Sequence, residues 1–117
     1  MNKVLGSCHC RNITFEAEMT KELSAYNPRS CDCRLCASHA ASYVSDSKGI
    51  LKINIKNFSK VNRYRQGSKI ADFLICMNCG VMTNVIYEEE GILFGSINVR
   101  ATMNFRSFGK EQAAHLT

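Results

Sequence analysis

Hydrophobic and polar residues alternate along several short stretches of the chain. In residues 50–56 an apolar side chain at every second position alternates with lysine or asparagine, and residues 13–18 show the same period of two. Because successive side chains of a strand point to opposite faces, this pattern predicts strands that are buried on one side only. Further strands are predicted at residues 42–45, 61–65, 70–75, 83–87 and 92–99.

Turns and helix signals complete the predicted architecture. Polar, glycine-containing segments at residues 45–49, 66–68 and 88–91 separate the strands. Gly95 interrupts the last strand, where a bulge or a close backbone approach is expected. One short helix is predicted at residues 34–41, with Asp32 as its N-cap, and residues 110–117 are expected to form a frayed turn. The 117 residues are therefore predicted to form one mainly β domain, 1–117, with at most one or two short helices.

Seven cysteines fall in three tight clusters. They are Cys8 and Cys10, then Cys31, Cys33 and Cys36, then Cys76 and Cys79. A disulfide framework is disfavoured, because an odd count leaves one thiol over and a bridge across a single intervening residue is strained. Redox-active thiols would explain one cluster but not three. Metal binding is the interpretation that accounts for all three clusters.

The lengths of the apolar segments indicate in which cellular compartment the protein is expected. The first eleven residues contain no apolar core of a secretory signal, and the longest apolar run, residues 73–77, is too short to cross a bilayer. We therefore expect a cytoplasmic protein that does not associate with a membrane. In that compartment thiols stay reduced and free to bind metal.

The count of seven suggests how the cysteines divide. A structural zinc takes four thiolates, whereas a reactive zinc takes three protein ligands and leaves its fourth position to water or substrate. The pair Cys76 and Cys79 has the spacing of a zinc knuckle, and Gly80 after it tolerates a positive φ. Combined with Cys8 and Cys10, which are expected on an extended segment, it predicts a closed four-thiolate site between the N-terminal strand and the second half of the sheet.

The central cluster of Cys31, Cys33 and Cys36 supplies three thiolates and no obvious fourth ligand. His39 lies three residues after Cys36 and would share its face on a helix. Three roles are open for His39: a ligand that closes the site, a proton carrier beside the metal, or ordinary packing. His9 is expected to point away from its cysteine neighbours and to be exposed or hydrogen-bonded rather than a ligand.

In order and spacing, the three clusters resemble the glutathione-dependent formaldehyde-activating enzyme family, which includes centromere-protein-V-like proteins. The resemblance runs from Gly6-Ser7-Cys8-His9-Cys10 to Gly95-Ser96-Ile97-Asn98-Val99 and covers nearly the whole chain. It implies an Mss4-like β-tent, a mainly β fold of antiparallel sheets pinned by zinc. It assigns the structural zinc to Cys8, Cys10, Cys76 and Cys79, and a second, more labile zinc at the active site to Cys31, Cys33 and Cys36.

The resemblance also implies a function. It predicts a zinc-dependent carbon–sulfur lyase or synthase that acts on thiol–aldehyde adducts, in the manner of an S-hydroxymethylglutathione synthase. Its partners would be a small thiol such as glutathione and an aldehyde such as formaldehyde. The three central cysteines and His39 would be catalytic, and Arg34 would receive a substrate carboxylate. Many family members carry histidine where this chain has Asp32, and a basic pair where it has Ala37-Ser38.

A second class of function is a non-catalytic, zinc-stabilised module that binds protein or nucleic acid. Basic and aromatic residues interleave at residues 63–65 and 104–108, which is compatible with such a surface. The formal net charge is +5 with neutral cysteines. Thiolates bound to two zinc ions would lower it to about +2, which is a weak electrostatic basis for nucleic-acid binding. We therefore do not expect a nucleic acid as the partner.

Overall fold

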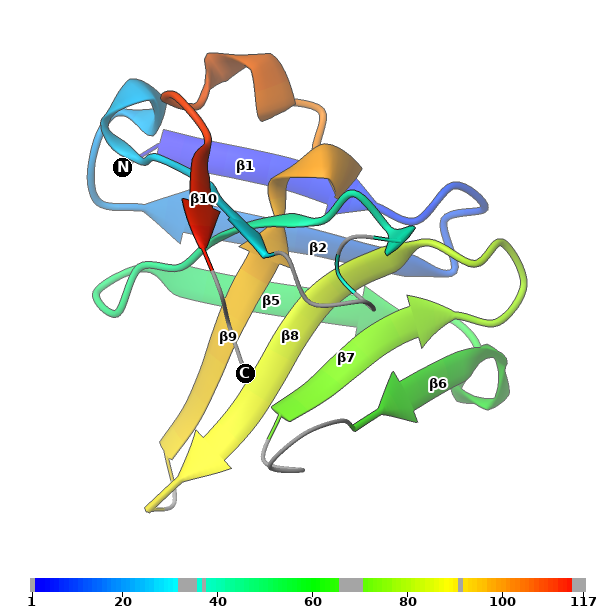
Figure 1. The fold of residues 1–117 in the computed structure, drawn as a ribbon. Helices are drawn as coiled ribbons and strands as arrows, with labels where there is room; N and C mark the ends of the chain where they lie inside the picture. The colour runs from blue at the N-terminus through cyan, green and yellow to red at the C-terminus, as the bar shows by residue number, and fades with distance from the viewer. Residues whose placement is uncertain (1, 32–35, 37, 66–70, 91, 115–117) are drawn as a thin grey trace.

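The computed structural model describes residues 2–31, 36, 38–65, 71–90 and 92–114, which form two β-sheets (Figure 1). The smaller sheet has the order β1-β2-β5 and holds β1 (Asn2–Ser7), β2 (Ile13–Met19) and β5 (Ile50–Ile55). The larger sheet has the order β10-β3-β4-β9-β8-β7-β6. Its strands are β3 (Arg29–Cys31), β4 (Ser42–Val44), β6 (Val61–Tyr64), β7 (Ala71–Cys76), β8 (Met82–Glu89), β9 (Ile92–Asn98) and β10 (Gln112–Ala114).

Neighbouring strands are antiparallel, except that β10 pairs with β3 in parallel. Short 3₁₀ turns connect some of them: η1 (Leu23–Ala25), η2 (Phe58–Lys60), η3 (Val99–Ala101) and η4 (Phe105–Ser107). The predicted class, mainly β with antiparallel sheets, is confirmed. Over the described residues, no helix has the length and apolar character that crossing a membrane requires.

The predicted strands are confirmed to within a few residues, whereas three short or weakly patterned ones were not foreseen. These are β1, β3 and β10. The C-terminal segment predicted as a frayed turn contains β10 instead, because Gln112–Ala114 finds a partner in Arg29–Cys31. Residues 34, 35 and 37 of the predicted helix at 34–41 lie outside the described residues, as does its predicted N-cap Asp32. Of the described part, Cys36 and Ser38 are helical and residues 39–40 form a turn.

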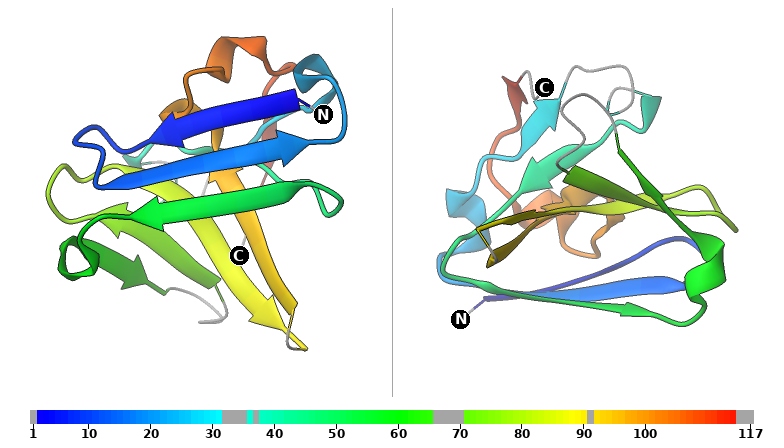
Figure 2. Two further views of the ribbon diagram at one scale, coloured as in Figure 1. Left: turned by 180° about the vertical axis from the view of Figure 1, so that it is seen from behind. Right: turned by 90° about the horizontal axis from the view of Figure 1, so that it is seen from below.

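The smaller sheet lies across one face of the larger one, so the two form separate layers (Figure 2). In β2 every second residue is buried, as the alternation predicted. Phe15, Ala17 and Met19 of β2 pack with Val44 and Ile97 of the larger sheet. This contact between layers is the main apolar core, and its burial drives the two sheets together.

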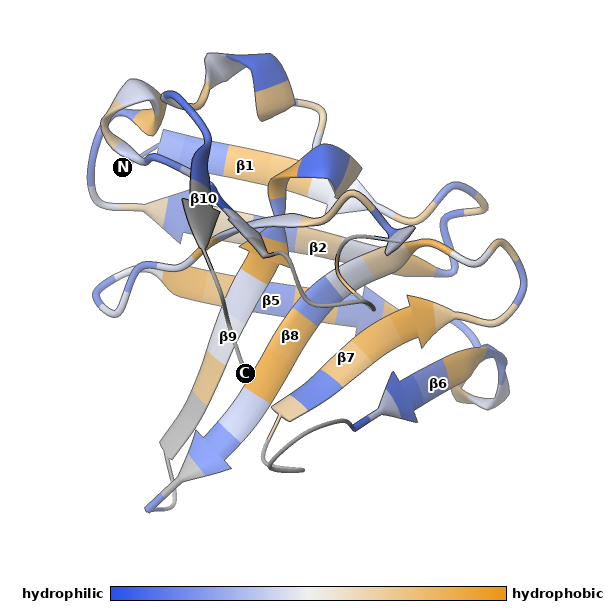
Figure 3. Ribbon diagram, in the orientation of Figure 1, coloured by the Kyte–Doolittle hydropathy of each residue, from blue (hydrophilic) through white to orange (hydrophobic). Residues whose placement is uncertain are grey.

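The larger sheet also buries side chains on its opposite face. On β7, Leu74 and Cys76 are buried on the face toward the smaller sheet. Phe73 and Ile75 alternate with them and pack against a second cluster around Tyr43. Both faces of this sheet therefore carry protein, which is consistent with the hydrophobic colouring of β7 and β8 in Figure 3.

Two glycines permit close contacts between elements. A Cβ on Gly95 would lie 2.7 Å from the Cδ2 atom of Leu51, so the predicted close approach at this residue is confirmed. A Cβ on Gly6 would overlap the ring of Phe15, its cross-strand partner. The ring of Phe15 occupies the space that any larger side chain at residue 6 would need.

We predict that Gly6→Ala lowers the free energy of unfolding by about 1–3 kcal/mol, because the buried Phe15 ring has to move. Urea unfolding of the metal-loaded protein at neutral pH measures the change. Ser7→Ala, at the next position of β1, is the control and should change stability by less than about 0.5 kcal/mol. Equal stability of Gly6→Ala and the unsubstituted protein would contradict the packing described here.

Candidate metal centre

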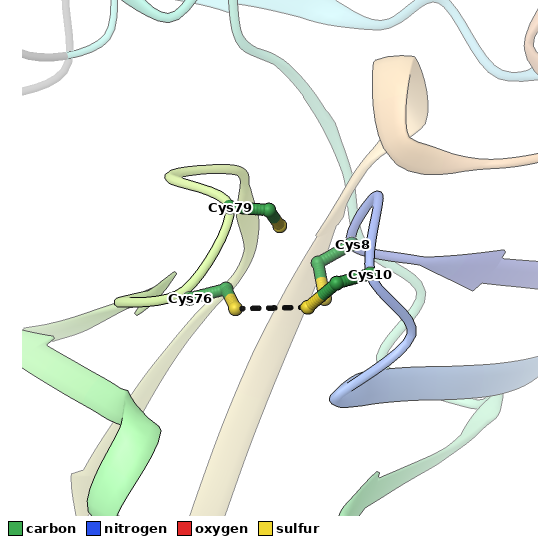
Figure 4. Close-up of side chains that lie close together, drawn as sticks. All are labelled: Cys8, Cys10, Cys76 and Cys79. Carbon is green, nitrogen blue, oxygen red and sulfur yellow. Dashed lines mark hydrogen bonds between the residues drawn. The ribbon is translucent and has the colours of Figure 1, made fainter.

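Two hairpin turns, far apart in the sequence, bring four cysteines together. Cys8 and Cys10 lie in the turn between β1 and β2, whereas Cys76 ends β7 and Cys79 lies in the turn before β8. Their four sulfur atoms all lie within 4.8 Å of one another. The side chains converge from both sides on one point, so they could hold a metal ion (Figure 4).

The sulfur spacing fits tetrahedral coordination. The Sγ atoms of Cys8 and Cys10 are 3.7 Å apart, and those of Cys10 and Cys76 are 3.5 Å apart. A tetrahedral zinc ion with bonds of about 2.3 Å places neighbouring sulfurs about 3.8 Å apart. A disulfide needs sulfurs about 2.05 Å apart, and all four cysteines are free. The donor set therefore suits a soft divalent metal rather than a disulfide.

The local backbone around Cys8 and Cys10 differs from the prediction. The expected extended segment is a tight turn, in which the N–H of Arg11 donates to the carbonyl of Cys8 over 3.1 Å. Arg11 has a φ of 67°, in the left-handed region. Turning, rather than extension, is what lets two cysteines separated by one residue direct their sulfurs to the same point.

The second turn follows the predicted knuckle. Gly80 has a φ of 79°, and its N–H donates to the carbonyl of Cys76 over 2.8 Å. A residue with a Cβ is rarely found at such a φ, so glycine is the natural occupant. The turn directs the N–H of Val81 toward the sulfur of Cys79. The turn predicted for Cys76 to Gly80, with a positive φ at the glycine, is confirmed.

Backbone and amide N–H groups already point at the sulfurs. The N–H of Ile13 donates to Cys8 Sγ over 3.3 Å. Cys8 and Cys76 are buried among apolar side chains that include Ile13 and Ile55, whereas Cys10 is exposed. One side of the cluster is thus shielded from water and the other faces it.

The cysteine pKa values reflect this asymmetry. Burial raises the pKa of the Cys8 thiol to about 11. The Asn78 side chain, followed by the backbone N–H of Asn12, lowers the pKa of Cys10 to about 6. Burial alone would raise the pKa of Cys79, but N–H groups of Cys10 and Val81 lower it overall. The site therefore stabilises negative charge unevenly, and a bound cation would favour ionisation of all four thiols.

His9 is exposed and does not join the four cysteines. This agrees with the expectation that it is not a ligand.

Asn78 and Asn12 were not singled out from the sequence. Asn78 lies between Cys76 and Cys79 in the sequence, so it could have been considered as a side chain that donates a hydrogen bond to a nearby sulfur.

The central cluster is described only in part. Cys33 and Arg34 lie outside the described residues, and Cys31 is described only as the last residue of β3. Cys36 is buried, and its Sγ lies 3.1 Å from the hydroxyl oxygen of Tyr43. The mutual geometry of the three central thiols thus also falls outside the described residues.

His39 and Tyr43 flank the described part of this cluster. The backbone N–H of His39 donates to the carbonyl of Cys36 over 3.2 Å. His39 is half-buried and lines a hollow with Ser38, Cys79 and Arg100. Tyr43 was not foreseen as a site residue, because its contact with Cys36 depends on how β4 packs after an intervening loop.

Three of the basic residues noted in the sequence make contacts within the chain. Arg63 and Arg65 both donate to the carboxylate of Asp72. The hydrogen bond from Arg65, with that from Arg63, lowers the pKa of Asp72 although its burial opposes this. Arg106 lies over the ring of Phe105, with 5.0 Å between the guanidinium carbon and the ring centroid. These contacts give Arg63, Arg65 and Arg106 partners within the chain.

A mainly β fold whose two sheets meet at four cysteine sulfurs defines the chain as a β protein with a cysteine cluster that could hold a metal ion. The sequence model of the glutathione-dependent formaldehyde-activating enzyme family matches residues 3–107, a span that contains all seven cysteines. The chain therefore belongs to this family, as its sequence predicted.

A solved structure supports the fold. The crystal structure of a Rhodobacter sphaeroides protein superposes with a TM-score of 0.59 and 22% sequence identity. The similarity covers 95% of this chain and 100% of that chain. At this identity the likeness concerns the fold alone. None of the curated proteins matches the chain in sequence.

We predict that Cys79→Ser loses the metal of the four-cysteine site and the cooperative unfolding transition. Binding of a structural metal contributes folding free energy of order 10 kcal/mol, and this variant removes one of its four donors. Metal analysis and circular dichroism on heating measure both effects. His9→Ala, in the opposite turn of the same site, is the control and should retain metal and melting temperature. A cooperative transition at the unsubstituted temperature for Cys79→Ser would contradict the assignment.

Proposed function

We propose that the protein is a zinc-dependent carbon–sulfur lyase or synthase that acts on adducts of a small thiol and an aldehyde. Glutathione and formaldehyde are the substrates suggested by the name of the family that matches residues 3–107. One domain of residues 1–117, acting in the cytoplasm, would carry both a structural and a reactive zinc. The match to this family is the observation that carries the proposal.

The two sites would differ in openness. Cys8, Cys10, Cys76 and Cys79 would hold a zinc ion with four protein donors, and the sulfur spacing supports this. Cys31, Cys33 and Cys36 would hold the second ion with three donors. A zinc with an open position supplies polarisation of a carbonyl or hydroxyl oxygen and lowers the pKa of a bound thiol.

The reaction itself conserves atoms and charge. The sulfur of the thiol attacks the carbonyl carbon of the aldehyde, and the carbon–sulfur bond forms as the carbonyl π bond breaks. The oxygen then takes up the proton that the thiol released, which gives a hydroxymethyl thioether. The reverse reaction breaks the same bond. Besides holding the two substrates, the protein therefore needs only one group that carries a proton from the thiol sulfur to the aldehyde oxygen.

His39 is proposed to move this proton. It follows Cys36 by three residues, is half-buried rather than fully enclosed, and borders a hollow open to solvent. Cys36 is fixed by burial and by its contact with the Tyr43 hydroxyl, so a site built on it has a rigid side. Arg34, outside the described residues, is proposed to bind a carboxylate of the thiol.

We predict that Cys33→Ser abolishes thiol–aldehyde activity and removes only the labile part of the bound zinc. The melting temperature should stay close to that of the unsubstituted protein, because the four-cysteine site remains complete. Aldehyde consumption, metal analysis after mild chelation and thermal melting are the measurements. Comparable melting temperatures for Cys33→Ser and Cys79→Ser, or two equally chelator-resistant zinc ions, would show that the division into reactive and structural sites is wrong.

Binding of a thiol should depend on pH and salt. If the thiol binds as thiolate, it releases a proton, so affinity rises as the pH approaches the pKa of the free thiol. Glutathione should bind more tightly than 2-mercaptoethanol at low salt, and the margin should shrink as salt screens its carboxylates. Calorimetry with both thiols at two salt concentrations tests this.

Arg34→Gln is the matched variant for this experiment and should reduce the margin between the two thiols without changing binding of 2-mercaptoethanol. Equal affinities in the unsubstituted protein would remove glutathione as the preferred thiol. Absence of thiol binding at every pH, with the second zinc present, would instead favour a binding module.

A further inference from the structure

A cleft of about 810 Å³ lies between the two sheets. Leu51, Ile53 and Ile55 of β5 line one side, and Leu74 of β7 and Ile86 of β8 line the other. We call this space the intersheet cleft. It lies on the opposite face of the larger sheet from Cys36, because Phe73 and Ile75, which alternate with Leu74, pack toward Cys36 instead.

The walls of the intersheet cleft keep apolar surface in contact with solvent. Leu51, Ile53 and Ile55 are all half-buried rather than buried. Covering apolar surface is favourable by roughly 25 cal/mol per Å². The volume of the cleft also falls within the range of about 300–1,000 Å³ that is usual for small-molecule sites. An apolar body of modest size therefore suits this space.

A basic pair stands at one end of the intersheet cleft. Arg63 lines the cleft, and with Arg65 it shares the carboxylate of Asp72. Figure 3 shows the change from hydrophobic β7 to hydrophilic β6. Asp72 shares the face of Leu74, so the pair lies next to the apolar wall. Two guanidinium groups against one carboxylate leave a net charge of +1.

The two arginines are positioned but still accessible. The Asp72 side chain is 5% exposed, whereas those of Arg63 and Arg65 are 63% and 56% exposed. Nη2 of Arg63 donates to Asp72 over 2.6 Å. A guanidinium has five N–H donors in a planar fork that matches a carboxylate. The buried carboxylate thus fixes the cations, and their exposed atoms face solvent.

Two acidic residues near the cleft bear on what it can bind. Asp46 lines the cleft, but its carboxylate accepts hydrogen bonds from the side chains of Thr20 and Tyr26 and the N–H of Lys48. Glu88 is exposed and shares the face of Ile86, two residues away. The carboxylate of Glu88 would therefore repel an anion bound near Arg63 and Arg65.

We propose that the intersheet cleft binds an amphipathic carboxylate with a medium-length alkyl chain, such as decanoate. The alkyl chain would lie against Leu51, Ile53 and Ile86, and the carboxylate would meet Arg63. This binding activity goes beyond the proposed thiol–aldehyde chemistry and uses none of the seven cysteines.

Calorimetry with the metal-loaded full chain at low salt tests the proposal. Decanoate, below its micellar concentration, is compared with decanol and decyltrimethylammonium. We expect decanoate to bind about tenfold more tightly than decanol, which corresponds to one charge-assisted contact. Decyltrimethylammonium should bind more weakly than decanol, because the net charge at the basic end repels it.

Matched variants locate the site. Arg63→Gln should remove most of the tenfold margin between decanoate and decanol, whereas Arg106→Gln, an arginine outside the cleft lining, should leave it unchanged. Glu88→Gln should tighten decanoate binding severalfold. Ile86→Trp, which fills the cleft, should weaken all three compounds. Circular dichroism of each variant verifies that it is folded.

Several results would overturn the proposal. These are equal affinity for the three compounds, an undiminished margin in Arg63→Gln, or no binding of decanoate at all. If the protein is a dimer, and decanoate dissociates it in proportion to the fraction of clefts that bind decanoate, the natural occupant of the cleft is a second copy of the chain instead. Cys33→Ser should bind decanoate like the unsubstituted protein, so the outcome is independent of whether the lyase proposal holds.

Discussion

The structure depends on the convergence of four sulfur atoms where the two sheets meet. Cys8 and Cys10 lie in a turn of the smaller sheet, whereas Cys76 ends a strand of the larger sheet and Cys79 lies in the turn that follows it. In the absence of a cation, four thiols so close together cannot all ionise without mutual repulsion. A divalent metal bound there would remove that repulsion and join two hairpins separated by more than sixty residues, which hydrophobic contact alone would position less uniquely.

The larger sheet allows one small chain to carry two different environments. Alternation along β7 places Cys76 and Leu74 toward the smaller sheet, and Phe73 and Ile75 toward Tyr43 and Cys36. The register shift between Leu74 and Ile75 skips Thr83 of β8, so Ile75 pairs with Met82, which lies in the Tyr43 cluster. Cys76 and the intersheet cleft thereby lie on the opposite face of β7 from Cys36.

Much of the fold could be predicted from the sequence because alternation over five or more residues is a strong signal, as in β2 and β5. Its limits have physical causes. β3 and β10 are three residues each, so they carry too little pattern, and β10 exists because a distant edge is available to it. In β1, Val4 and Leu5 are adjacent apolar residues followed by Gly6, so the segment lacks the alternation that indicates a strand. Gly6 is required there because the Phe15 ring packs against it, not because the chain turns.

The parts of the candidate site that depend on residues close together in the sequence could be predicted. The contacts that depend on the pairing register of two strands could not. The spacing Cys76, Cys79 and Gly80 fixes the knuckle within five residues, and the structure agrees. In contrast, Arg63 and Arg65 were noted as part of a basic and aromatic segment compatible with a binding surface, because their partner could not be known. Asp72 reaches both only through the antiparallel register of β6 and β7, which the sequence does not determine.

The parallel pairing of β10 with β3 has a consequence for how the chain assembles during synthesis. All ligands of the four-cysteine site are present once Cys79 has left the ribosome, and β8 and β9 follow directly. Gln112–Ala114 emerges after the other described strands, yet it borders the strand that ends at Cys31. Vectorial synthesis would therefore complete the two cysteine-bearing hairpins before the edge of the strand that ends at Cys31 is covered.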